Sequence, residues 1–310
     1  MSKKIALVFP GQGSQTVGML NELYQEFSVV RDTFAEASAA LGYDLWQLVA
    51  NGPEEALNET HRTQPALLTA SVAVWRVWQQ QGGATPAFMA GHSLGEYSAL
   101  VCAGVLGLAD AVKLVEKRGQ YMQTAVPAGT GAMSAIIGLD DALIAKACEE
   151  AAQGEVVSPV NYNSPGQVVI AGNKAAVERA NELCKAAGAK RALPLPVSVP
   201  SHCALMKPAA EQLTSDLAAL SFAAMQIPVV NNVDVAVVDS ADAVKDALIR
   251  QLYSPVRWTE SVEWLVAQGV TDIVELGAGK VLSGLIKRIH KETTTSSVND
   301  LASLQAALSA

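Results

Sequence analysis

The feature that most constrains the fold is the pentapeptide Gly91-His92-Ser93-Leu94-Gly95, which lies between a short apolar run and a helix-forming stretch. Residues 87–90 are apolar enough for a buried strand, and residues 96–103 favour a helix. A serine at a sharp strand-to-helix turn stands clear of the backbone, with the free N–H groups of the helix beneath it. The alternative is a glycine-rich turn whose serine has no chemical role. We interpret Ser93 as a nucleophile that attacks a carbonyl group.

The rest of the chain predicts an α/β fold with buried parallel strands. Half of the 310 residues are hydrophobic, yet no apolar run reaches the roughly 20 residues that span a bilayer. Short apolar runs at 5–9, 227–230 and 272–276 alternate with helical stretches such as 65–81 and 109–124. The apolar N-terminal run is too short for a signal peptide. The polar stretch 293–299 predicts a loosely structured segment before a short terminal helix.

Residues 128–198 differ in pattern from the segments on either side. Their strand-like and helical stretches follow the order βαββαβ, and a Pro-Gly turn at Pro165 and Gly166 joins the two middle strands. This order is typical of a split βαβ, or ferredoxin-like, unit. We therefore expect a catalytic core built from residues 1–127 and 199–310, interrupted by a ferredoxin-like small domain at 128–198.

Charge and cysteine content narrow the class of protein. The net charge of −8 argues against general nucleic-acid binding, so an anionic partner must meet a local basic surface. Two groups of basic residues could form one, although ordinary solvated helix faces are the alternative: Lys185, Lys190 and Arg191, and Lys280, Lys287 and Arg288. The four cysteines have no metal-ligand spacing and read as reduced core residues of a cytoplasmic protein without a metal site: Cys102, Cys148, Cys184 and Cys203.

A serine nucleophile needs a base, and the sequence offers four histidines. His92 adjoins Ser93, so its side chain points away. His61 lies in a polar segment, and His290 ends a basic helix, where it suits the helix dipole. That leaves His202, at a strand-to-helix junction, as the predicted base. The alternative is a helix-start histidine that contacts solvent.

The sequence has no obvious carboxylate to orient the histidine between Ser93 and His202, where α/β-hydrolases carry it. The aspartates between Ser93 and His202 all lie at helix starts, where capping explains them: Asp110, Asp140 and Asp141. We therefore expect a Ser–His pair whose imidazole is oriented by a neutral acceptor such as a backbone carbonyl.

Two further roles can be placed on the sequence. The oxyanion formed on attack needs fixed donors, and the backbone N–H of Leu94 and the loop around Gln12 can supply them. Arg118 lies among apolar residues of the following helix. Aimed inward it would hold a carboxylate through two parallel hydrogen bonds, and aimed outward it would only reach solvent; the sequence leaves both open.

Taken together, residues 9–15 (FPGQGSQ), residues 91–97 (GHSLGEY), Arg118 and residues 200–202 (PSH) resemble the malonyl-CoA:acyl carrier protein transacylases over nearly the whole chain. The resemblance implies an α/β-hydrolase-like parallel-sheet core with an inserted ferredoxin-like domain. It implies that Arg118 binds the malonyl carboxylate and that the backbone carbonyl of Gln251 orients the histidine. It also implies that Asn161 and Asn163 lie near the cleft. The chain departs from the family at Ala278, where proline is frequent.

The implied reaction transfers malonyl from malonyl-CoA to Ser93 and then to the phosphopantetheine thiol of acyl carrier protein, as a step of fatty acid biosynthesis. No cofactor, metal, nucleic acid or membrane is implied, and a monomer is expected. A serine hydrolase, either a thioesterase or a lipase-like enzyme, is the alternative, since water could accept the acyl group. A third interpretation is an inactive scaffold that binds acyl carrier protein, against which an intact Ser93 and His202 argue.

Overall fold

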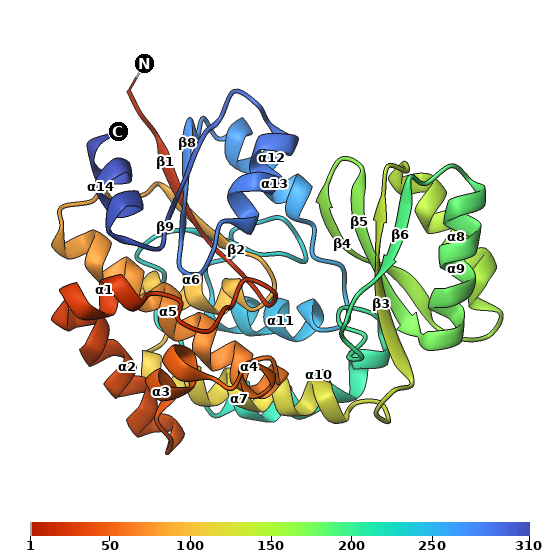
Figure 1. Ribbon diagram of the computed structural model, residues 1–310, viewed down its shortest axis with the longest axis horizontal. Helices are drawn as coiled ribbons and strands as arrows, with labels where there is room; N and C mark the ends of the chain where they lie inside the picture. Colours follow the sequence, from red (N-terminus) through yellow and green to blue (C-terminus); the bar gives the residue numbers. More distant parts are fainter. Residues whose placement is uncertain (1) are drawn as a thin grey trace.

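The computed structural model describes residues 2–310 and contains two separate β-sheets (Figure 1). The larger sheet has five parallel strands in the order β7-β2-β1-β8-β9. Its strands are β1 (Ile5–Phe9), β2 (Phe88–Gly91), β7 (Val229–Val230), β8 (Asp272–Leu276) and β9 (Thr294–Val298). The carboxyl ends of parallel strands meet at one edge, which is where ligands bind in open α/β sheets.

Helices cover both faces of this sheet. Successive side chains of a strand point to opposite faces, and those of β1 enter two different apolar clusters. Leu7 and Phe9 pack with helices α5 (Thr60–Gln80), α6 (Gly95–Cys102) and α7 (Leu108–Thr124). Ala6 and Val8 pack with α12 (Trp258–Ala267) and α13 (Val281–Ile289). This double covering explains why the central strands are apolar throughout.

The remaining core helices lie around this framework. Helices α2 and α10 pack against α7, which itself packs along α5. The elements are α1 (Asn21–Glu26), α2 (Ser28–Leu41), α3 (Leu45–Asn51), α4 (Glu54–Leu57), the 3-10 helix η1 (Ala204–Met206), α10 (Lys207–Ala218), α11 (Ala241–Gln251) and α14 (Leu301–Ser309). None of the helices within residues 2–310 is both long and apolar enough to cross a membrane.

The second sheet is antiparallel, with the strand order β4-β5-β3-β6. Its elements follow one another as β3 (Gly131–Ile137), α8 (Asp141–Ala152), β4 (Val157–Ser164), β5 (Gln167–Asn173), α9 (Lys174–Ala186) and β6 (Arg191–Pro194). Figure 1 shows α8 and α9 covering the face that points away from the core. The opposite face packs against Cys203 of the core. The chain is thus a mixed α/β protein with a parallel and a separate antiparallel sheet, as the sequence predicts.

The small sheet is joined to the core by backbone hydrogen bonds. Val256, just before α12, donates from its N–H to the carbonyl of Val160 at 2.8 Å, and its own carbonyl accepts from the N–H of Tyr162 at 3.0 Å. Strand β4 is therefore hydrogen-bonded through its main chain to the core segment that precedes α12.

Three details of the sequence prediction were wrong. Residues 294–298 form the edge strand β9, not a loose segment; only Val298 of this strand is buried, so its sequence needs little apolar content. Helix α5 begins at Thr60, five residues before the predicted start at Pro65. The prediction missed its first turn because the side chains buried there, Thr63 and Gln64, are polar and give no apolar pattern. Strand β7 is confined to two residues.

Candidate active site

Ser93 lies at a strained turn between β2 and α6. Its φ angle of 54° falls in the left-handed region, which residues other than glycine rarely adopt. The flanking glycines are required by space. A Cβ atom on Gly91 would overlap the backbone of Gly95, and one on Gly95 would overlap the carbonyl of Phe9 at the end of β1. The turn is therefore pressed against the central strand, and Ser93 is partly buried at its tip.

His202 contacts Ser93 directly. Its Nε2 lies 2.7 Å from Ser93 Oγ, and its Nδ1 lies 2.7 Å from the backbone carbonyl oxygen of Gln251. A carbonyl only accepts, so Nδ1 carries the hydrogen and Nε2 is left to accept the serine proton. Burial, followed by the charge on Arg118, lowers the pKa of His202 to about 3, so the imidazole is neutral at physiological pH.

Arg118 points inward, which settles the alternative that the sequence left open. The side chain is 1% exposed, and its Nη2 lies 3.3 Å from Ser93 Oγ. Two glutamines hold the guanidinium: Nη1 donates to Gln64 at 2.8 Å, and Nη2 donates to Gln251 at 3.0 Å. Burial lowers the pKa of Arg118, and the nearby Tyr97 and Glu96 oppose that effect. The result is a buried cation fixed beside the nucleophile.

The two residues predicted to supply oxyanion donors both reach the cavity of Ser93. Gln12, in the loop after β1, and Leu94 both line the cavity that contains Ser93 and His202. Within residues 2–310, neither backbone N–H has a hydrogen-bond acceptor. The side chain of Gln12 is occupied by Thr60, whose hydroxyl donates to it at 3.1 Å. Two unpaired N–H groups beside a nucleophile are the arrangement that a developing oxyanion needs.

The two asparagines are placed differently from each other. Asn161 lines the cavity, and its buried Oδ1 has no partner among the described residues. Asn163 lies outside the lining, and its Oδ1 contacts Nε2 of His92 at 2.7 Å. The structure therefore brings Asn161 to the cavity and pairs Asn163 with His92, which itself lines the cavity.

The cavity has a volume of about 600 Å³ and opens between the two parts of the chain. The core contributes Ser93, His202 and Arg118, and the small sheet contributes Met133 and Asn161. Segment 195–199, which follows β6, lines the same space. No group of three metal-binding side chains occurs within the part of the chain described. The arrangement suits nucleophilic attack on an acyl group that carries a negative charge.

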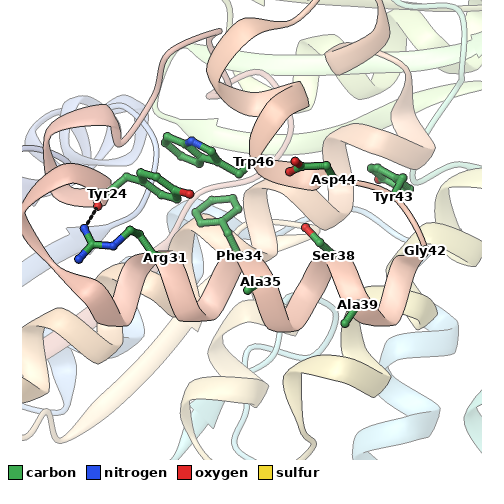
Figure 2. Close-up of a pocket in the computed structure, with 10 residues that line it drawn as sticks. All are labelled: Tyr24, Arg31, Phe34, Ala35, Ser38, Ala39, Gly42, Tyr43, Asp44 and Trp46. Atoms are coloured by element: carbon green, nitrogen blue, oxygen red, sulfur yellow. Dashed lines mark hydrogen bonds between the residues drawn. The ribbon is translucent and has the colours of Figure 1, made fainter.

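A second cavity, of about 570 Å³, lies on the surface of α1, α2 and α3 and holds no nucleophile (Figure 2). Tyr24, Phe34 and Trp46 form its aromatic wall. Arg31 donates to the carbonyls of Tyr24 and Gln25, so its guanidinium closes the end of α1. Ser38 and Asp44 likewise accept from backbone N–H groups at the start of α3, so these polar groups already serve the fold.

Sequence reasoning missed Gln64, Glu96 and Asn232. Gln64 holds Arg118, Asn232 contacts the turn around Ser93, and Glu96 accepts from the backbone N–H of Asn232. Gln64 stands in a polar stretch and carried no local signal, whereas Asn232 directly follows the apolar strand β7, a placement that could have drawn attention to it.

Comparison with known proteins gives a consistent result. The family model described as the acyl transferase domain matches residues 6–306. The malonyl CoA-acyl carrier protein transacylase of Salmonella typhimurium is 70% identical over 305 residues, which cover 98% of this chain and 99% of the relative.

Solved structures agree in fold. An acyl carrier protein S-malonyltransferase from Vibrio cholerae superimposes with a TM-score of 0.97 at 70% identity, covering 98% of this chain and 99% of the other. A malonyl-transacylase in complex with the acyl carrier protein of a type II polyketide synthase has a TM-score of 0.98 at 64% identity, with 99% of both chains covered.

Proposed function

The chain belongs to the family of acyl transferase domains, and from this premise we propose that it moves a malonyl group from malonyl-CoA to the phosphopantetheine thiol of an acyl carrier protein. One observation carries the proposal. Ser93 Oγ lies between a neutral base, His202, and a buried cation, Arg118. A nucleophile placed in this way is suited to an acyl group that ends in a carboxylate.

In the first half-reaction, Ser93 Oγ attacks the thioester carbonyl while its proton passes to Nε2 of His202. The negative charge on the carbonyl oxygen is stabilised by the N–H groups of Gln12 and Leu94. Collapse of the tetrahedral intermediate breaks the carbon–sulfur bond, and coenzyme A leaves with the proton from His202. The product is a malonyl ester on Ser93.

The second half-reaction reverses these roles. His202 takes the proton of the phosphopantetheine thiol, and the thiolate attacks the ester carbonyl. The carbon–oxygen bond breaks, and Ser93 Oγ recovers a proton from the imidazolium. Gln251 serves both steps, because its backbone carbonyl fixes the histidine tautomer while its side chain holds Arg118.

Arg118 selects the acyl group. A carboxylate entering a buried cavity loses its hydration, and the guanidinium compensates through charge-assisted hydrogen bonds. The carboxylate also offsets the positive charge that disfavours protonation of His202. Malonyl binding therefore makes the base stronger at the moment when it must accept a proton. Asn161 lines the cavity from β4, so its side chain contacts the substrate on the side of the small sheet.

The carrier protein docks on basic residues at one end of the small sheet. Arg191 and Gln167 both pair with Ile137 across the sheet, and Arg288 of α13 donates to Gln167 at 3.2 Å. Clusters almost 100 residues apart in sequence thus meet along one rim: Lys190 and Arg191 with Lys287 and Arg288. An acidic carrier protein is attracted to such a rim even though the net charge of this chain is −8.

The proposal extends to the organisation of the chain. Its core, residues 1–127 and 199–310, is α/β-hydrolase-like in that the nucleophile sits on the turn after β2, an inner strand of the parallel sheet. Residues 128–198 form an inserted ferredoxin-like domain. The protein acts as a monomer in the cytoplasm, where its four buried cysteines stay reduced.

Serine hydrolysis is not favoured, because the curated relatives are named transacylases and a buried arginine serves no purpose toward a neutral ester. The experiment is a mass measurement of the intact protein after mixing with malonyl-CoA. We expect a malonyl adduct on Ser93 that is lost on addition of a thiol acceptor, and none in Ser93→Ala. An unmodified wild-type protein would refute the proposal.

A further inference from the structure

Asn232 holds both sides of the turn that carries Ser93. Its Oδ1 accepts from the backbone N–H of Ser93 at 2.8 Å, and its Nδ2 donates to the carbonyl of Gly91 at 2.6 Å. The asparagine is fully buried and lies just after strand β7, next to β2 in the sheet. One carboxamide therefore pairs with the residue before His92 and with the residue after it. A side chain needs both a donor and an acceptor to do this.

Glu96 holds Asn232 in turn. Its Oε1 accepts from the backbone N–H of Asn232 at 2.7 Å, and the side-chain amide of Gln251 lies 3.4 Å from the same oxygen. That amide also donates to the carbonyl of Ser93 at 3.0 Å. Glu96 is 2% exposed and lies in the first turn of α6. The backbone N–H of Asn232 and the side-chain amide of Gln251 thus converge on a single buried carboxylate.

This arrangement bears on the reactivity of Ser93. Ser93 adopts a left-handed backbone conformation, which is strained for a residue with a side chain and persists only where surrounding contacts impose it. The contact with Asn232 also occupies the N–H of Ser93, so the donors that remain for an oxyanion are those of Leu94 and Gln12. The N–H of Ser93 therefore serves to fix the turn, while the N–H groups of Leu94 and Gln12 stay available for substrate.

We propose that Asn232, fixed by Glu96, is a positioning residue that keeps the Ser93 hydroxyl aligned with His202 and with the oxyanion donors. The choice of malonyl-CoA as the reactant rests on the proposed function, whereas the contacts of Asn232 and Glu96 do not depend on it. Asn232 contacts neither substrate nor base, so its loss should slow bond formation and leave binding of malonyl-CoA intact. A misplacement of about 1 Å at a reacting centre can cost about a hundredfold in rate.

The neighbouring Asn231 provides a matched control. It is also an asparagine, is 4% exposed and accepts through its Oδ1 from the N–H of Asp234 in the following turn. Removing either side chain takes a buried amide from the same segment, but only Asn232 contacts the turn around Ser93. Comparison of the two variants separates a loss of stability from a loss of positioning.

The test measures single-turnover acylation of Ser93 by malonyl-CoA in Asn232→Ala, Asn231→Ala, Glu96→Ala and Glu96→Gln. We expect Asn232→Ala to lower the maximal rate by about 10- to 100-fold, with the half-saturating concentration within about threefold of wild type. Glu96→Ala should resemble it. Glu96→Gln should recover most of the rate, because a carboxamide oxygen can still accept from Asn232 N–H. Asn231→Ala should lower the melting temperature as much but keep the rate.

A second probe makes the result independent of the malonyl reaction. Phenylmethanesulfonyl fluoride sulfonylates a reactive serine without using Arg118, and its rate should fall in Asn232→Ala but not in Asn231→Ala. If wild-type protein reacts with this probe but not with malonyl-CoA, the proposed function fails while the positioning role is still measured. Equal rates for the two asparagine variants with the probe, or a change in half-saturation alone, would overturn the positioning role.

Discussion

Substitution of Arg118 by alanine should remove the preference for malonyl-CoA. Ser93 and His202 can acylate with any thioester that fits, so discrimination requires a group that contacts the carboxylate. Arg118 is 1% exposed and already lies 3.3 Å from Ser93 Oγ, within reach of a carboxylate that one methylene group separates from the ester carbonyl. Acetyl-CoA has no carboxylate and leaves this buried cation unpaired, which is a penalty against the wrong substrate.

The magnitude follows from the two hydrogen bonds that a guanidinium donates to a carboxylate. Each contributes about 1.5–3 kcal/mol when one partner is charged. The lower figure for both gives about 3 kcal/mol, and a factor of ten in rate corresponds to about 1.4 kcal/mol. Arg118→Ala should therefore lower kcat/KM for malonyl-CoA by about a hundredfold or more. Arg118→Lys should recover only part of this, because an ammonium group cannot form the same planar pair of bonds.

The assay compares kcat/KM for malonyl-CoA and acetyl-CoA in wild type, Arg118→Ala and Arg118→Lys. Acetyl transfer should be unchanged or improved by either substitution. Arg76→Ala is a suitable control, since Arg76 is a partly buried arginine that contacts Thr33 and Glu36 far from Ser93. Equal losses on both substrates in Arg118→Ala would refute the reasoning and would make Arg118 a structural residue.

Three other predictions follow from the site. Ser93→Ala and His202→Ala should each abolish most of the rate of malonyl transfer, and the double variant should lose little more because the two residues act as a unit; additive losses would contradict the pairing. Because the pKa of His202 is lowered to about 3, kcat/KM for Ser93 acylation should stay nearly constant between about pH 7.5 and about pH 5.5, whereas a histidine with the ordinary pKa of about 6.5 would lose about tenfold. Charge reversal of Lys190 and Arg191, or of Lys287 and Arg288, should slow transfer to acyl carrier protein and reduce its salt dependence while leaving acylation by malonyl-CoA intact. Reversal of Lys113, an exposed lysine of α7, serves as the control, and equal transfer rates in all of these variants would exclude this docking surface.

The sequence predicted what depends on neighbours along the chain. The turn at Ser93 could be located because its glycines and the flanking strand and helix are contiguous in residues 88–102. His202 followed by elimination, since only four histidines are present. The need for a carbonyl that orients His202 followed from the absence of a suitable acid. Its identification as Gln251 required a resemblance to known proteins.

What could not be predicted depends on packing across long stretches of chain. The inward direction of Arg118 is decided by Gln64 and Gln251, which lie 54 and 133 residues away in sequence. The contact between Ser93 and Asn232 spans 139 residues. No local pattern marks such a partner, because a buried amide differs from an exposed one only in what folds around it. Strand β9 was not predicted for a related reason, since its register is set by pairing with β8.

The most direct test of the account is the fate of the malonyl group on Ser93. Protein malonylated with malonyl-CoA is separated from excess substrate and mixed with acyl carrier protein that bears phosphopantetheine. The products are followed over a single turnover. We expect the malonyl group to appear on the carrier thiol much faster than free malonate appears without carrier, and Arg118→Ala to form little malonyl ester. Release of malonate at the same rate with and without carrier would contradict the account and identify a hydrolase.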